Sequence, residues 1–227
     1  MYRRYAIFYT PGPNTPLARF GAEWLGWDSA TGRACAHPDV AGLDVAQITE
    51  TPRKYGFHGT IKAPFRLAEG CSAHTLGDAL RAFCAQRAQV EITGVTLARL
   101  GRFLALVPDG PQPALAAMAG EAVKIFDPFR APLTAAELAK RRQSRLNAAQ
   151  EANLVRWGYP FVLENFRFHM TLTGRLAKEE TGKVEAALGD LLRPLDLSPH
   201  VMTGLTLLGE DDAGRFHQVE RYGFGGS

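Results

Sequence analysis

The sequence lacks the features of disulfide-rich, membrane-spanning and metal-dependent proteins. Its 227 residues hold three cysteines, Cys35, Cys71 and Cys84, with no Cys-x-x-Cys pair, which argues against a disulfide framework and favours a reduced, cytoplasmic protein. No HxH or HExxH motif and no glycine-rich phosphate loop occurs, so we expect no metal site and neither an ATP nor an NAD cofactor. No apolar run approaches the length of a membrane span, and the apolar start is too short for a signal peptide.

The charge and the length of the chain constrain its partners and its number of domains less strictly. Hydrophobic residues make up 46% and charged residues 22% of the chain, as in ordinary soluble globular proteins. The net charge of +3 permits an anionic small molecule or an RNA end as partner but does not argue for a duplex-binding surface. A chain of this length can bury a core in one large domain or in two closely packed lobes.

The local patterns predict strands and helices in a regular order. Capping boxes at Thr134–Glu137 and at Asn147–Gln150 predict two separate helices between residues 134 and 157. Turn formers without a period over residues 28–52 predict irregular structure. The other elements expected are strands or hairpins at 5–11, 54–65, 90–110, 166–173 and 201–224, and helices at 16–27, 72–88, 113–127 and 178–195.

A coarse repeat runs through this order: a strand with His-x-Thr, a helix and a β-hairpin occur once in each half. Helices that accompany sequential hairpins indicate an α+β fold with two antiparallel sheets. We expect one domain over residues 1–227.

The two His-x-Thr motifs, "FHGT" and "FHMT", are the strongest candidates for a site. Because side chains alternate along a strand, His58, Thr60 and Lys62 share one face, and His169 and Thr171 share the corresponding face of the second strand. If these polar faces meet, they form a groove with two imidazoles and at least two hydroxyls. The alternative for either histidine alone is a hydrogen-bonded strand residue without a role in catalysis.

The stretches "TPRKYGFHGTIKAPFRL", "FDPFRAPL" and "RWGYPFVLENFRFHMTLTGRL" resemble the 2H phosphoesterase superfamily, the LigT-like enzymes. They resemble more narrowly its branch of proteins that are assigned to phosphonate metabolism and have no known function. The resemblance implies a metal-independent phosphoesterase with two lobes in a pseudo-twofold arrangement around a central groove, but no particular substrate.

The residues suit the opening of a cyclic phosphodiester. One imidazole activates water and the other protonates the leaving oxygen, while Thr60, Thr171 and Lys62 stabilise the charge that develops on phosphorus. The sequence does not say which histidine is the base. A binding module for a nucleotide or an RNA end, and an RNA end-joining ligase, remain alternatives, and turnover of cyclic phosphates separates them from a hydrolase.

Three further cations are candidates for substrate binding. Lys54 is in phase with His58 if the strand extends that far and would hold a second phosphate; the alternative is a solvated strand end. Arg130, between prolines, and Arg175, just past Gly174, would reach an anion, with a surface ion pair as the alternative. The run "KRRQSR" at 140–145 is interpreted as a solvated helix face, with a lid or phosphate funnel as the minor alternative.

Overall fold

The computed structural model describes residues 2–225 of the chain. The helices are α1 (Pro16–Leu25), α2 (Val45–Arg53), α3 (Ala73–Ala85), α4 (Pro113–Ile125), α5 (Ala135–Arg142), α6 (Ala148–Trp157) and α7 (Lys178–Leu192), with 3₁₀ turns η1 (Asp127–Phe129) and η2 (Leu163–Asn165). The strands are β1 (Arg4–Tyr9), β2 (Trp27–Asp28), β3 (Arg33–Ala34), β4 (Gly59–Phe65), β5 (Val90–Ile92), β6 (Val95–Leu100), β7 (Phe103–Pro108), β8 (Met170–Thr171), β9 (His200–Met202), β10 (Gly204–Glu210) and β11 (Phe216–Gly223).

One large antiparallel sheet organises the molecule, with the strand order β11-β10-β1-β4-β8-β7-β6. Its two halves, β11-β10-β1-β4 and β8-β7-β6, are joined where Gly59 pairs with Met170. The α+β class and the antiparallel pairing predicted from the sequence are confirmed. The two sheets predicted from the sequence correspond to the two halves of this sheet, and the pairing of β4 with β8 joins them into one.

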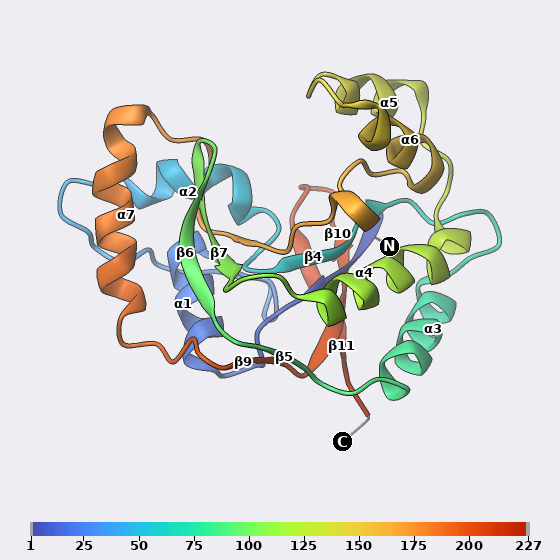
Figure 1. Cartoon of the computed structure of the whole chain (residues 1–227), viewed down its shortest axis with the longest axis horizontal. Coiled ribbons are helices and arrows are strands. Elements are labelled where there is room, and N and C mark those ends of the chain that lie inside the picture. Colours follow the sequence, from blue (N-terminus) through green and yellow to red (C-terminus); the bar gives the residue numbers. More distant parts are fainter. Residues whose placement is uncertain (1, 226–227) are drawn as a thin grey trace.

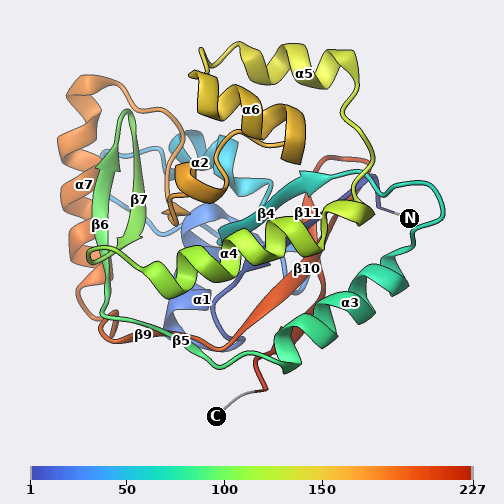
Figure 2. The same ribbon diagram turned by 45° about the vertical axis from the view of Figure 1, so that its right-hand side comes forward.

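The two faces of the sheet bury different side chains. On β1, Tyr5, Ile7 and Tyr9 point into the main core, which also contains side chains of α1, α3, α4 and α7. Ala6 and Phe8 point to the opposite face and pack in a smaller cluster with Leu208 and Phe216. Helix α4 lies beside β4 in both views of the chain (Figures 1 and 2). The second face is therefore the one left for a site.

The two predicted capping boxes are present and mark the starts of helices α5 and α6. The Thr134 hydroxyl accepts from the backbone of Glu137 and the Asn147 side chain accepts from that of Gln150, and in each case the reverse bond is also made. These boxes separate α5 from α6, and Gly158 ends α6 in a left-handed conformation with φ 74°. Figures 1 and 2 show both helices together at one edge of the molecule, beyond the end of β4.

The segment 28–52 differs from the prediction, because it contains helix α2 and the strands β2 and β3. The helical sequence VAQITETPR has several residues of low helix propensity. Tertiary contacts compensate: Asp44 caps the helix, and Arg53 Nε donates to the carbonyl of Leu25 at the end of α1, at 2.8 Å.

The strands that carry the two motifs are shorter than the sequence indicated. The first starts at Gly59 and the second contains only Met170 and Thr171. His58 and His169 are thus each the residue immediately before a strand.

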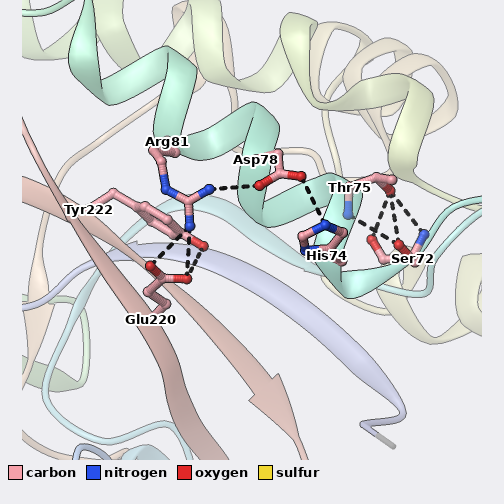
Figure 3. Close-up of polar contacts among 7 residues, drawn as sticks. All are labelled: Ser72, His74, Thr75, Asp78, Arg81, Glu220 and Tyr222. Atoms are coloured by element: carbon pink, nitrogen blue, oxygen red, sulfur yellow. Dashed lines mark hydrogen bonds and ion pairs between the residues drawn. The ribbon is translucent and has the colours of Figure 1, made fainter.

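Polar contacts at the surface connect α3 to the last strand (Figure 3). Arg81 donates to Asp78 at 2.6 Å and to Glu220 of β11 at 3.2 Å, and the Tyr222 hydroxyl donates to Glu220 at 2.8 Å. Because Asp78, Arg81 and Glu220 are exposed, the buried Leu76 and Leu80 of α3 contribute more to its attachment.

Across residues 2–225, no helix combines the length and the apolar character needed to cross a membrane.

Candidate active site

The junction of the two half-sheets brings the His-x-Thr motifs together. Gly59 pairs with Met170 in an antiparallel register. In an antiparallel register, the residues on either side of this pair also lie opposite each other. His58 is therefore opposite Thr171, and Thr60 is opposite His169. Met170 is fully buried in the main core, so the four motif side chains point to the opposite face of the sheet.

Gly59 makes this junction possible. A Cβ atom at position 59 would come within 2.4 Å of the Phe168 ring, which is closer than side-chain atoms approach each other. The glycine in the first motif therefore lets Phe168, the residue before His169, pack against the first strand.

Both imidazoles are held by the same contact. His58 Nδ1 lies 2.8 Å from the carbonyl oxygen of Gly56, and His169 Nδ1 lies 2.8 Å from that of Arg167. A carbonyl oxygen can only accept, so Nδ1 carries the proton in each ring and Nε2 remains as the working atom. Nε2 of His58 lies 3.3 Å from the Thr60 hydroxyl.

The surroundings of His58 are apolar. Its ring stacks on Phe8 with 3.9 Å between ring centroids and lies 5.6 Å from the ring of Tyr55. Burial lowers the pKa of His58 to about 4, against the raising effect of the Gly56 carbonyl, and the charge of His169 lowers it further. His58 is therefore neutral at pH 7, with an unprotonated Nε2 that accepts from the Thr60 hydroxyl until a substrate or water takes that place.

A cavity of about 410 Å³ lies over the motifs and is lined by His58, Thr60 and Thr171. His169 is outside this lining; its ring lies 5.9 Å from that of Phe103, which forms part of the wall. Three of the four motif side chains thus open directly into the cavity, and the fourth lies beside its wall.

Several wall residues were not candidates in the sequence analysis. Arg141 of α5 and Tyr159 line the cavity, with the guanidinium 5.0 Å from the tyrosine ring centroid. Tyr55 also lines it. Arg141 belongs to the run 140–145, which was interpreted as a solvated helix face with a phosphate funnel as the minor alternative; in the structure its side chain is half-buried and lines the cavity.

Lys62 does not lie on the face of His58 and Thr60, so the predicted alternation is wrong at this position. Across from β1, Thr60 pairs with Phe8 and Lys62 pairs with the next residue, Ile7, so the register shifts there. This β-bulge turns Lys62 to the face that Ile7 occupies. Its ammonium donates to the carbonyl of Val123 at 3.0 Å and lies 3.8 Å from Asp127.

The three other predicted cations have different positions. Arg175 is exposed and lines the cavity over the motifs. Lys54 follows α2 and lines a neighbouring cavity, as Arg130 does. Arg130 makes the ion pair given as its alternative role, 2.9 Å from Asp127.

Within residues 2–225, no group of three or more histidine, cysteine, aspartate or glutamate side chains is arranged to hold a metal ion.

The model of the family DUF1045, described as a protein of unknown function, matches residues 60–217. Two curated proteins are similar, both named ribose 1,5-bisphosphate phosphokinase PhnN. The one from Janthinobacterium sp. (strain Marseille) is 38% identical, with 98% of this chain and 51% of that protein covered. The one from Laribacter hongkongensis (strain HLHK9) is 34% identical, with 93% and 49% covered. The chain spans about half the length of these relatives.

Solved structures that superpose on the chain are more distant. Escherichia coli LigT complexed with 3'-AMP gives a TM-score of 0.44 at 14% identity, covering 99% of both chains. A structure described as a phosphoesterase gives 0.42 at 14% identity, covering 98% of both.

Proposed function

The chain belongs to the DUF1045 family, whose function is unknown, and from its own side chains we propose that it is a hydrolase that opens a cyclic phosphodiester. The observation that carries the proposal is the register at the junction, which sets two imidazoles and two hydroxyls on one face beside a cavity. This set supplies a base, an acid and two hydrogen-bond donors, the groups that such a ring opening needs.

We assign the base to His58, because it is neutral at pH 7 and its Nε2 is unprotonated. Nε2 takes a proton from water, and the water oxygen forms a bond to phosphorus. The bond from phosphorus to one ring oxygen breaks, and His169 Nε2–H delivers a proton to that oxygen. The product is a phosphate monoester beside a free hydroxyl.

The hydroxyls of Thr60 and Thr171 then donate hydrogen bonds to the non-bridging oxygens of phosphorus as charge accumulates there. Arg175, which lines the cavity, supplies positive charge. The imidazole pair provides both proton transfers, so the proposed reaction requires no metal ion.

The curated relatives suggest ribose as the substrate's sugar. Their name contains ribose 1,5-bisphosphate. A 1,2-cyclic phosphate of ribose keeps its phosphate on carbon 1, as in that compound, when the bond from phosphorus to the oxygen of carbon 2 is the one that breaks. The present sequence has no G-x-x-x-x-G-K-[ST] loop for a nucleotide. We therefore assign the kinase step to the part of those relatives outside the match.

The test is turnover of a panel of cyclic phosphates, including ribose 1,2-cyclic phosphate and nucleoside 2',3'-cyclic phosphates, followed by phosphorus NMR. We expect a monoester product, the same rate after treatment with a chelator, and no product with the His58→Ala, His169→Ala double variant. Binding of the panel without product would instead identify a binding module. Joining of RNA ends without hydrolysis would identify a ligase.

A further inference from the structure

A second cavity adjoins the one over the motifs. It measures about 660 Å³, and we call it the basic chamber. Six residues line both cavities: Arg4, Tyr55, Ala63, Pro64, Arg141 and Tyr159. The two cavities are therefore adjacent along these residues, as a single small molecule that occupied both would require.

The basic chamber concentrates positive charge. Eight lysines and arginines line it against two glutamates, Glu137 and Glu210. This local excess of six exceeds the net charge of +3 of the whole chain. An anionic ligand group is therefore favoured here.

Half of these cations have a protein carboxylate within 4.0 Å. Arg4 donates to Glu210 through two nitrogens, at 2.5 and 2.6 Å, and Arg66 pairs with Glu137 at 3.1 Å. Lys62 and Arg130 share Asp127, at 3.8 and 2.9 Å.

The other half have no such partner. Within residues 2–225, no carboxylate lies within 4.0 Å of the side-chain nitrogens of Arg3, Lys54, Lys140 or Arg141. Aromatic rings hold two of them without neutralising their charge: Lys54 lies 4.8 Å from the centroid of Tyr55, and Arg141 lies 5.0 Å from that of Tyr159.

Arg141 lies on the boundary of the two cavities and is half-buried. Burial lowers its pKa, and the charge of Arg4 lowers it further. A partly desolvated guanidinium without a counter-ion gains strongly from an anion, above all from a phosphate that accepts two of its N–H groups.

We propose that the basic chamber binds a second phosphate group of the substrate, a phosphate monoester, while the cyclic phosphate lies at the motifs. Arg141 contacts it at the boundary, and Lys54 and Lys140 contact it within the chamber. This assignment rests on the proposed function. It narrows the substrate to a cyclic phosphate of a sugar that already carries a monoester, such as a ribose phosphorylated at carbon 5.

The test compares two substrates that differ in that group, ribose 1,2-cyclic phosphate and its 5-phosphorylated form. We expect kcat/KM to be roughly 10–100-fold higher for the phosphorylated form, the effect of one or two charge-assisted hydrogen bonds. In a Lys54→Met, Lys140→Met double variant this preference should fall by roughly tenfold or more. Both lysines are exposed, so their replacement should leave folding intact. Lys178→Met is the control, because Lys178 is exposed on α7 and lies outside both cavities.

The outcomes separate the two proposals. Hydrolysis of both substrates with equal kcat/KM would overturn the second phosphate site and leave the hydrolase intact. Hydrolysis of neither would overturn the hydrolase. In that case, calorimetry with ribose 5-phosphate tests the basic chamber alone. A dissociation constant that the double variant raises roughly tenfold or more supports the site. An equal dissociation constant for wild type and double variant, or no binding to wild type, overturns it.

Discussion

The imidazoles of His58 and His169 are held by the same hydrogen bond but lie in different surroundings. Each Nδ1 donates to the carbonyl two residues earlier, at 2.8 Å. Only His58 stacks on a buried ring, that of Phe8, and opens directly into the cavity. In the proposed reaction these different neighbours are what assign the base to His58 and the acid to His169, as environments do for acid–base pairs in active sites.

Replacing either histidine should reveal these roles. We expect His58→Ala and His169→Ala each to lower kcat on a cyclic phosphate by on the order of 10²–10⁴, the scale for losing one general acid or base. The double variant should lose less than the product of the two, because the pair works as a unit. Thr60→Ala and Thr171→Ala should each cost on the order of 10–10³, since water replaces part of one donor. Full activity in the absence of both histidines, measured by steady-state kinetics, would refute the assignment.

The dependence of kcat/KM on pH should identify the base. His58 must be neutral to accept a proton, and its pKa is lowered to about 4. The rate should therefore fall on the acid side only as the pH approaches 4, below the range of an ordinary imidazole. If His58 were the acid, the rate would already decline above pH 4 as it loses its proton, and little activity would remain at pH 7. The profile of the His58→Ala variant is the control, because it should lack the acid limb.

Strand β4 shows how one irregular element redirects a side chain. The register shift between Phe8 and Ile7 removes Lys62 from the cavity over the motifs and buries it to 3% exposure. Burial lowers the pKa of Lys62 to about 8 against the attraction of Asp127, and the charge of Arg130 lowers it further. The residue that alternation assigned to catalysis therefore carries a cost in folding at neutral pH.

This cost predicts a pH-dependent difference in stability. Between pH 8 and 10.5, Lys62 loses its proton in the folded protein but keeps it in the unfolded chain. The unfolded state then binds more protons, so the free energy of unfolding contributed by Lys62 rises with pH. Relative to Lys62→Met, wild type should gain up to about 3 kcal/mol across this range.

Urea denaturation at pH 7.5 and 10 measures this gain. Lys124→Met, which removes a lysine from an exposed position of α4, is the control. A difference between wild type and Lys62→Met that stays constant with pH would contradict the account.

Elements with local signals were predictable from the sequence, and those fixed by tertiary contacts were not. The capping boxes at Thr134 and Asn147 located α5 and α6, because caps act within one turn. Helix α2 was missed, because its stability depends on contacts such as that of Arg53 with Leu25. The bulge at β4 was missed for the same reason, because it arises from the register between β1 and β4 and has no signal within either strand alone.

At the scale of the whole molecule, the site depends on a junction between two distant segments. The sequence indicated two polar faces but not how the sheets that carry them are joined, and the pair Gly59 and Met170 supplies that join. The contribution of α5 to the wall required the full fold, because Arg141 lies in a basic run with no strand or motif nearby. The two motifs could therefore be located from the sequence, whereas the residues that shape the space around them could not.

That space predicts a preference for small substrates. Arg141 of α5 and Tyr159, just past α6, form one wall of the cavity over the motifs, and Thr51 and Pro52 at the end of α2 line it too. Figures 1 and 2 show the α5–α6 pair at one edge of the molecule. A cyclic phosphate at the end of an oligonucleotide carries further nucleotides that meet these walls. We expect kcat/KM for a 2',3'-cyclic mononucleotide to exceed that for a cyclic-ended oligonucleotide by at least about tenfold, equivalent to about 1.4 kcal/mol of lost binding.

The comparison needs a control for charge, because an oligonucleotide is also drawn to the basic chamber. The same oligonucleotide with a free 3'-hydroxyl serves as a competitive inhibitor: its inhibition constant reports attraction to the surface without cleavage. Weak inhibition together with slow cleavage would locate the discrimination in the walls. Equal kcat/KM for the mononucleotide and the oligonucleotide would show that α5 and α6 do not restrict access, and long RNA ends would then become the better candidates for the substrate.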